Sequence, residues 1–244
     1  MRTILALLML CVLSAATLDQ RYVQVVERDG NTSIEKSADL GLLSVQMNPG
    51  AFDRMADICE QSSELHCSVD AENKVVTLTD QFQSGGYYTY ESEYGLPFVT
   101  HTLTVDSIPT DRFARLMDRL FDNANATGMV SGAGGPLYLS QKEENARGAE
   151  LLKELGVTIT YTVELPSAVS EARAGSVEAV VEGNLATFDL VAVLEDSEPL
   201  VVKSSELNFG YIVLVGGVAV LAALAWSFMG SRPKPRKPAK KRKK

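Results

Sequence analysis

The sequence contains few of the side chains that carry catalysis and metal binding. It has two histidines, three cysteines and one tryptophan in 244 residues. His66 and His101 both fall in strand-like runs, without a cysteine or carboxylate cluster at metal-ligand spacing. We interpret both as structural, with a ligand pair as the alternative, and we expect no metal and no cofactor.

Motifs of hydrolysis and nucleotide binding are also absent. The chain has no Gly-x-Ser-x-Gly elbow and no His-Glu-x-x-His pair. The glycine-rich stretch 128–136 lacks the Lys-Ser/Thr pair and the preceding strand of a phosphate loop, so we interpret it as a linker or mobile loop. These absences favour a protein that is not an enzyme, with an unrecognised envelope hydrolase as the alternative.

Acidic residues are missing from both ends of the chain. All 31 Asp and Glu lie in residues 17–207, together with 13 of the 23 Lys and Arg, which gives this part a net charge of −18. The last fourteen residues, 231–244, carry nine Lys and Arg and no acid. The overall charge of −8 therefore combines an acidic domain with a basic tail.

The N-terminus has the pattern of a secretory signal peptide. Arg2 precedes an apolar run over residues 4–13, and Ser14-Ala15-Ala16 supplies the small residues that a signal peptidase needs. We predict a signal peptide over residues 1–16. The alternative is an uncleaved anchor, although about ten apolar residues are short for a bilayer. Lipidation at Cys11 is disfavoured because Leu10 stands where a lipoprotein signal has a small residue.

A long uncharged run precedes the basic tail. Residues 209–229 contain no charged side chain, and as a helix they would extend about 31 Å, the thickness of the hydrocarbon core. Tyr211 and Trp226 stand near its two ends, where aromatic rings favour the membrane interface. We predict a transmembrane helix over residues 208–230, with a buried core helix as the alternative.

The basic tail, residues 231–244, predicts the orientation of this helix. Lys and Arg next to a span remain in the cytoplasm, so the protein would be a single-pass, type I protein of the cell membrane with residues 17–207 outside. Such a tail could also lie against anionic lipid heads. Since no aromatic residue interleaves the charges, we expect no nucleic acid.

One face of the predicted span is rich in small residues. They could form a helix-packing face, because small side chains let two helices approach closely, or they could face lipid. The five residues are Gly216, Gly217, Ala219, Ala222 and Ala223.

Residues 17–207 predict an α+β domain with a largely antiparallel sheet and about three helices. Three pairs of strand-like runs flank turns at 29–31, 71–73 and 95–97. Apolar residues recur at helical spacing after Pro49, after Thr110 and after Ser140. Strand-like runs follow over residues 157–165, 176–183, 185–194 and 199–205. Because hairpins and helices mix without regular alternation, a parallel doubly wound sheet is disfavoured.

Cysteine usage fits an exported domain. Once the signal is removed, Cys59 and Cys67 form an even pair in an oxidising compartment. We predict a disulfide between them, with two free buried thiols as the alternative. Asn31 and Asn125 begin glycosylation sequons.

Three tyrosines share one side of a predicted strand. Tyr88, Tyr90 and Tyr94 could form a ledge for an acyl chain or a glycan, since tyrosine combines an apolar body with a polar tip. Packing against a neighbouring strand is the alternative. The acidic domain would repel anionic lipid heads, so a neutral, cationic or glycan ligand is easier to accommodate.

The last third of the domain resembles a known family. Residues 157–190 read VTITYTVELPSAVSEARAGSVEAVVEGNLATFDL and are similar to the closing part of LppM-like extracytoplasmic domains. Leu165-Pro166 matches the family's corner and Gly183 with Phe188-Asp189-Leu190 matches its later strand, whereas Ser167 replaces a glycine and Phe188 a tryptophan. The motif covers 34 of the 244 residues, and the overall layout is similar too. The resemblance implies a lipid- or glycolipid-binding module and transfers no catalytic residue.

These observations support one leading hypothesis and two alternatives. The leading one is a noncatalytic membrane protein whose outer domain binds a lipid, a glycolipid or a protein partner. The second is a subunit of a membrane secretion or envelope complex, assembled through the transmembrane helix. The third is the unrecognised hydrolase.

Overall fold

The computed structural model describes residues 19–41, 50–62, 66–83, 85–110, 113, 115, 120, 137–154 and 158–230. The chain forms two compact units, which we treat separately. Unit 1 comprises Met1–Glu93 and Thr100–Glu206, and unit 2 comprises Tyr94–Val99 and Leu207–Lys244. The predicted signal peptide, the glycine-rich stretch, the sequon at Asn125 and the basic tail lie outside the described residues.

The first two predicted hairpins are confirmed. Strands β1 (Asp19–Val26) and β2 (Thr32–Asp39) pair antiparallel across a turn in which Gly30 has a φ of 85°. That conformation is open to glycine without steric cost, which explains the Asp-Gly turn. Strands β3 (His66–Asp70) and β4 (Val75–Phe82) also pair antiparallel, and β4 then pairs with β2.

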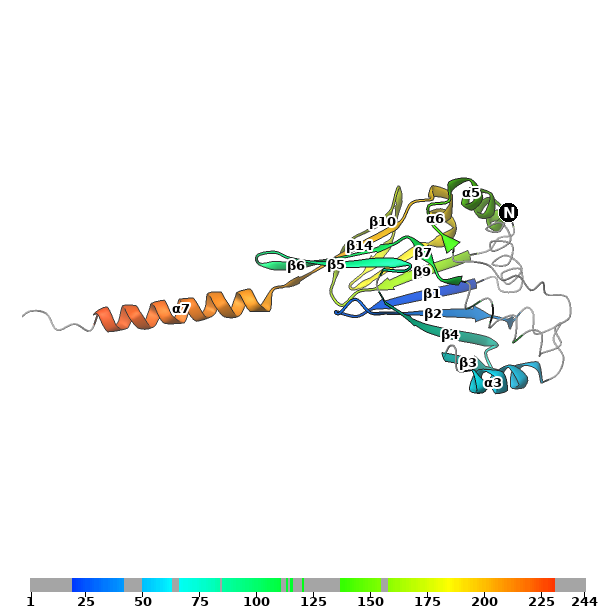
Figure 1. Ribbon diagram of the computed structural model, residues 1–244, viewed down its shortest axis with the longest axis horizontal. Helices are drawn as coiled ribbons and strands as arrows, with labels where there is room; N and C mark the ends of the chain where they lie inside the picture. Colours follow the sequence, from blue (N-terminus) through cyan, green and yellow to red (C-terminus); the bar gives the residue numbers. More distant parts are fainter. Residues whose placement is uncertain are drawn as a thin grey trace, which may run out of the picture. The chain divides into compact units, whose positions relative to one another are not determined.

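A seven-stranded sheet forms the body of unit 1 (Figure 1). Its order is β12-β13-β9-β1-β2-β4-β3. The three strands not yet introduced are β9 (Thr158–Glu164), β12 (Val180–Glu182) and β13 (Leu185–Asp189). At its centre β1 runs parallel to β9, about 140 residues later, with Tyr22 opposite Tyr161. The other five pairs of neighbouring strands in this sheet are antiparallel, so the predicted α+β class with largely antiparallel pairing is confirmed.

A second sheet has five strands in the order β11-β10-β14-β6-β5. They are β5 (Tyr88–Tyr94), β6 (Phe98–Val105), β10 (Val169–Ala174), β11 (Val177–Glu178) and β14 (Leu200–Leu207). Strands β5 and β6 are neighbours joined by residues 95–97, so the third hairpin is also confirmed. Two further short strands, β7 (Ser107–Ile108) and β8 (Leu137–Tyr138), pair with each other.

The structure describes four complete helices: α3 (Ala51–Gln61), α5 (Lys142–Glu154), α6 (Leu190–Asp196) and α7 (Phe209–Gly230). Helix α3 begins after Gly50 and buries Phe52, Met55 and Cys59, as the apolar spacing predicts. Of the helix expected after Thr110, the described residues Phe113 and Leu120 are helical and fully buried.

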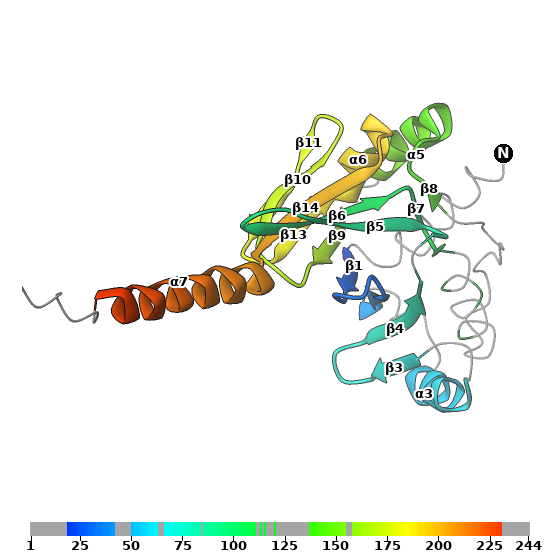
Figure 2. The ribbon, with the colours of Figure 1, turned by 60° about the vertical axis from the view of Figure 1, so that its left-hand side comes forward.

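Our prediction of one strand over residues 185–194 was wrong. The run divides into β13 and α6 at Asp189, whose carboxylate accepts hydrogen bonds from the backbone N–H groups of Val191 (2.9 Å) and Ala192 (3.4 Å). An aspartate in this position satisfies the free N–H groups of a helix start. Helix α6 lies beside α5 (Figure 2). Four apolar residues of α6 are buried: Leu190, Val191, Val193 and Leu194.

The predicted disulfide is present. Cys59 at the end of α3 is bonded to Cys67 on β3, with their Cα atoms 5.0 Å apart. The bond closes a short loop and ties the helix to the edge strand of the seven-stranded sheet. Loop closure of this length stabilises the folded state by about 2.5 kcal/mol.

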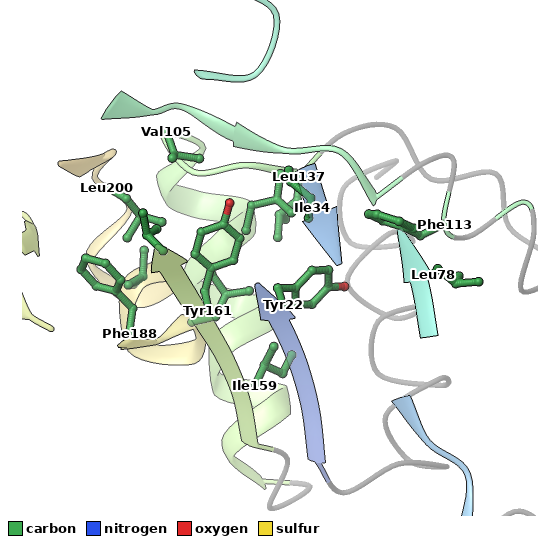
Figure 3. Packing of buried hydrophobic residues seen from close by; sticks show 14 of the residues in the cluster. Tyr22, Ile34, Leu78, Val105, Phe113, Leu137, Ile159, Tyr161, Phe188 and Leu200 are labelled. Carbon is green, nitrogen blue, oxygen red and sulfur yellow. The ribbon is translucent and has the colours of Figure 1, made fainter. Parts of the chain in front are cut away.

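The core of unit 1 contains two stacked tyrosines (Figure 3). The rings of Tyr22 and Tyr161 have centroids 6.2 Å apart, and both side chains are fully buried. Ile34, Leu78 and Ile159 are buried on the same inner face of the sheet. Because strands alternate their side chains, this face is set by every second residue of β1, β2, β4 and β9.

Candidate functional site

Helix α7 is long and apolar enough to cross a membrane. It has 22 residues and no charged side chain, which corresponds to about 33 Å. None of the residues Phe209–Ser227 is buried. The structure therefore supports one candidate membrane span near the C-terminus.

Only three of the five residues of the predicted helix-packing face lie on the same side of α7. At about 100° per residue, Gly216, Ala219 and Ala223 fall within an arc of about 60°, whereas Gly217 and Ala222 flank it. A Cβ atom added at Gly216 or Gly217 would meet no atom within 4 Å, so the backbone is open there. The packing role of these five residues stays a prediction.

Unit 2 joins this helix to the tip of the β5–β6 hairpin. The Asn208 backbone N–H donates to the Pro97 carbonyl (2.9 Å), and its side-chain amide donates to the Gly95 carbonyl (3.4 Å). The Asn208 side-chain oxygen accepts from the backbone N–H of Tyr211 (3.2 Å) and so caps α7. Asn208 thus forms hydrogen bonds both with the first turn of α7 and with the tip of the β5–β6 hairpin.

The three predicted ledge tyrosines have different environments. Tyr88 is buried, and its hydroxyl donates to the carbonyls of Gly30 (2.8 Å) and Phe82 (3.2 Å), so it belongs to the core. Burial, together with the charge of Asp29, raises the pKa of Tyr88. Tyr90 is half-buried, and Tyr94 is 78% exposed. A ligand ledge therefore stays a prediction for the last two alone.

His101 is the centre of a polar cluster on the five-stranded sheet. Its ring stacks on Tyr90 with centroids 5.7 Å apart, and its Nδ1 lies 2.8 Å from the Ser92 hydroxyl. Its Nε2 lies 3.7 Å from the Glu206 carboxylate, which pairs with Arg28 at 2.9 Å. These residue types occur in hydrolytic triads, but the histidine–carboxylate distance exceeds that of a hydrogen bond. Our interpretation of His101 as structural agrees with its burial in strand β6, and His66 lies exposed on β3.

A polar groove lies at the β1–β2 turn and the end of β4. Its volume is about 480 Å³. It is lined by Glu27, Asn31, Thr32, Ser33, Gln81, Phe82 and Gln83. Amide, hydroxyl and carboxylate groups of this kind suit a ligand with many hydroxyl groups. The sequon residue Asn31 lies in this groove.

Lys36 was missed by our sequence analysis. It lies on β2 between Ile34 and Ala38 in the inward row and is only 4% exposed. Its ammonium lies 5.2 Å from the centre of the Tyr22 ring. The alternation of β2 was the available signal, because residues 32, 34, 36 and 38 share one face of a strand.

Tyr22 and Gln24 lie beside Lys36 on the same face of the sheet. Tyr22 is the direct partner of Lys36 in the β1–β2 register, and Gln24 follows two residues later. The Tyr161 hydroxyl donates to Gln24 Oε1 at 2.6 Å, and burial raises the pKa of Tyr161, so this hydroxyl remains protonated. Within the described chain, Tyr22 Oη and Gln24 Nε2 are buried without a hydrogen-bond partner.

Comparisons with known proteins identify no relative of this chain. No family model, no curated protein and no solved structure matches it. The resemblance of residues 157–190 to LppM-like domains therefore stays a prediction.

Proposed function

We propose that the chain is a single-pass, type I membrane protein whose outer α+β domain binds an envelope lipid or glycolipid without catalysing a reaction. Helix α7 is the observation that carries this proposal. An uncharged helix of 22 residues with its side chains exposed has no favourable environment in water, and burial in lipid removes that apolar surface from solvent.

The orientation follows from the charges. Residues 231–244 carry nine Lys and Arg, which favours a cytoplasmic C-terminus. Protease added to intact cells should then digest the outer domain and leave a C-terminal epitope intact. A protected domain with a digested C-terminal epitope would contradict the proposed topology. Lysed cells, in which both parts are accessible, provide the control.

The tip of the β5–β6 hairpin supports a membrane-proximal position within unit 2. Tyr94, Leu96 and Phe98 are 78%, 73% and 49% exposed, and residues 94–99 carry no charge. Since Asn208 binds both the tip and the start of α7, the tip would lie at the depth of the helix start. Aromatic and apolar side chains are stabilised in that interfacial layer.

Fluorescence in brominated lipid vesicles tests the tip and the span separately. The native Trp226 should be quenched if α7 crosses the bilayer. In a Trp226→Phe background, Leu96→Trp should be quenched by lipids brominated near the headgroup. Val180→Trp, which replaces a valine of unit 1 that is 66% exposed, is the comparison outside unit 2. Quenching of Trp226 without quenching at position 96 would refute the interfacial tip alone.

The ligand class is supported by the resemblance and by the polar groove. A groove lined by amide and hydroxyl side chains suits the sugar of a glycolipid. The purified protein should retain at least one member of a panel of envelope lipids and glycans, and Gln81→Ala with Gln83→Ala should weaken a glycan ligand. Undetectable binding across the whole panel would remove this proposal. We expect no nucleic acid, because the domain is strongly acidic.

Assembly through the membrane is the second candidate function, favoured by the open backbone at Gly216 and Gly217. Crosslinking in native membranes should then trap a complex that Gly216→Ile disrupts and Val215→Ile preserves. Monomer alone would count against assembly.

The envelope hydrolase is less well supported, since His101 Nε2 lies 3.7 Å from Glu206. Ester hydrolysis lost in Ser92→Ala would revive it.

A further inference from the structure

Lys36 places a charged side chain on the buried inner face of the seven-stranded sheet. The side chain is 4% exposed, and among the residues that the structure describes its ammonium has one polar interaction, with the face of the Tyr22 ring. A buried charge is costly unless an opposite charge or several hydrogen bonds accompany it. The ring gives part of this compensation, because the face of an aromatic ring attracts a cation.

Two polar side chains beside Lys36, those of Tyr22 and Gln24, can also donate hydrogen bonds. Tyr161 donates to Gln24 Oε1, which leaves the Gln24 amide N–H₂ as the group without a partner in the described structure. The Tyr22 hydroxyl is likewise buried without an acceptor there. Its direction is visible in Figure 3, where the hydroxyl points away from Tyr161. An ammonium, a hydroxyl and an amide N–H₂ therefore occupy adjacent positions of one sheet face.

We propose that Lys36, Tyr22 and Gln24 form a binding site for the carboxylate or phosphate group of an amphiphile. An anion supplies the counter-charge and the acceptor oxygens that these three donors lack. Two of the inner-face side chains next to these donors, Ile34 and Leu78, are buried and apolar. A ligand that brings one anionic group into apolar surroundings has an acyl chain or another apolar body.

Among the described inward residues of β1, β2, β4 and β9, Asp80 is the one acid. It lies on β4, one diagonal place from Lys36, since Lys36 pairs with Leu78. Tyr22 and Gln24 lie on β1, on the opposite side of β2, and are therefore farther from Asp80 in strand order. The net charge of −18 outside affects the approach of such a ligand, but ions screen it beyond about 8 Å, and the adjacent ammonium dominates at the site.

This inference rests on the proposed function, because it names the ligand group that the outer domain binds. The test uses the full chain in neutral detergent with four probes: palmitate, phosphatidic acid, acetate and inorganic phosphate. Retention of either amphiphile should weaken about tenfold or more in Lys36→Gln. It should weaken less in Tyr22→Phe, which keeps the ring. Lys74→Gln is the matched control, since Lys74 also lies over an aromatic ring, 4.8 Å from the centre of Phe52, but is half-exposed.

The probes distinguish the possible sources of the anion. Binding of palmitate or phosphatidic acid with weak binding of acetate and phosphate supports a lipid headgroup. Equally tight binding of the free anions, lost in Lys36→Gln, would assign the same site to a small anion and overturn the amphiphile. Unchanged amphiphile retention in Lys36→Gln, or no retention of any probe, would overturn the site. Neutral lipid or glycan binding that persists in Lys36→Gln would leave the proposed function standing without this site. A single cooperative melting transition identifies folded variants.

Discussion

Replacing Lys36 by methionine should make the unliganded protein more stable. The side chain is 4% exposed, and among the described residues its ammonium has one polar contact, with the Tyr22 ring, whose centre lies 5.2 Å away. Removing the ammonium from water costs several kcal/mol even after relaxation, and a desolvated cation–ring contact returns about 2 kcal/mol. Methionine fills similar space with an apolar chain. We therefore expect a gain of about 1–3 kcal/mol in the free energy of unfolding.

Chemical denaturation of the full chain in neutral detergent measures this gain, with the circular dichroism signal of the sheet as the monitor of unfolding. In thermal unfolding, each kcal/mol raises the melting temperature of a domain of this size by about 2–4 °C. Lys74→Met is the matched control, because the Lys74 ammonium donates to the Ala71 carbonyl at 2.6 Å and lies over Phe52. It should lose up to about 1 kcal/mol.

A loss of stability in Lys36→Met would refute the reasoning. It would mean that the ammonium has a counter-charge in the folded protein, so that the site is already satisfied without a ligand. A gain in stability together with lost amphiphile retention would mean that Lys36 is needed to bind the ligand and lowers the free energy of unfolding of the unliganded protein. Stability and binding must therefore be measured on the same preparation.

Three further predictions concern the rest of unit 1. Cys59→Ser with Cys67→Ser should lower the free energy of unfolding by about 2.5 kcal/mol, seen in denaturation without reductant, and reductant should destabilise the native protein but not the variant. Asp189→Ala removes the cap of α6 and should lower the free energy of unfolding by about 1 kcal/mol, whereas Asp189→Asn should retain most of the stability that the cap contributes. The hydrogen bond from Lys203 (2.7 Å) holds the pKa of Glu171 below its ordinary value, so the stability that this pair contributes is present above the unfolded pKa and is lost as the pH falls through the folded pKa. Lys203→Gln should raise the Glu171 pKa in an NMR titration, and an unchanged value would contradict the assignment.

The local features of the fold could be predicted from the sequence. Asp29-Gly30 specifies a turn through the positive φ of Gly30, and the flanking strands pair in the expected antiparallel register. The disulfide follows from an even pair of cysteines in short separation. The long apolar helix, a candidate membrane span, follows from the absence of charge over more than twenty residues. Each of these signals is contained within about thirty residues of chain.

The long-range features could not be predicted in the same way. The parallel pairing of β1 with β9 places Tyr22 opposite Tyr161, and no local pattern states which distant strand will pair at the centre of a sheet.

The prediction of a strand over residues 185–194 was wrong for a different reason. Val191 and Val193 favour strands by propensity, but the Asp189 cap and burial among other apolar side chains of α6 outweigh that preference.

Lys36 differs from the other lysines of the described chain in its burial. Lys74 and Lys203 are half-exposed, and Lys142 and Lys153 are exposed. Lys203 and Lys153 pair with Glu171 and Glu195. The domain has 31 carboxylates, so a partner for one more lysine is chemically easy to supply. Lys36 occupies an inward strand position, and among the described residues no carboxylate forms an ion pair with it. An anion from outside the chain would explain this lysine, because folding alone would favour a methionine or leucine there.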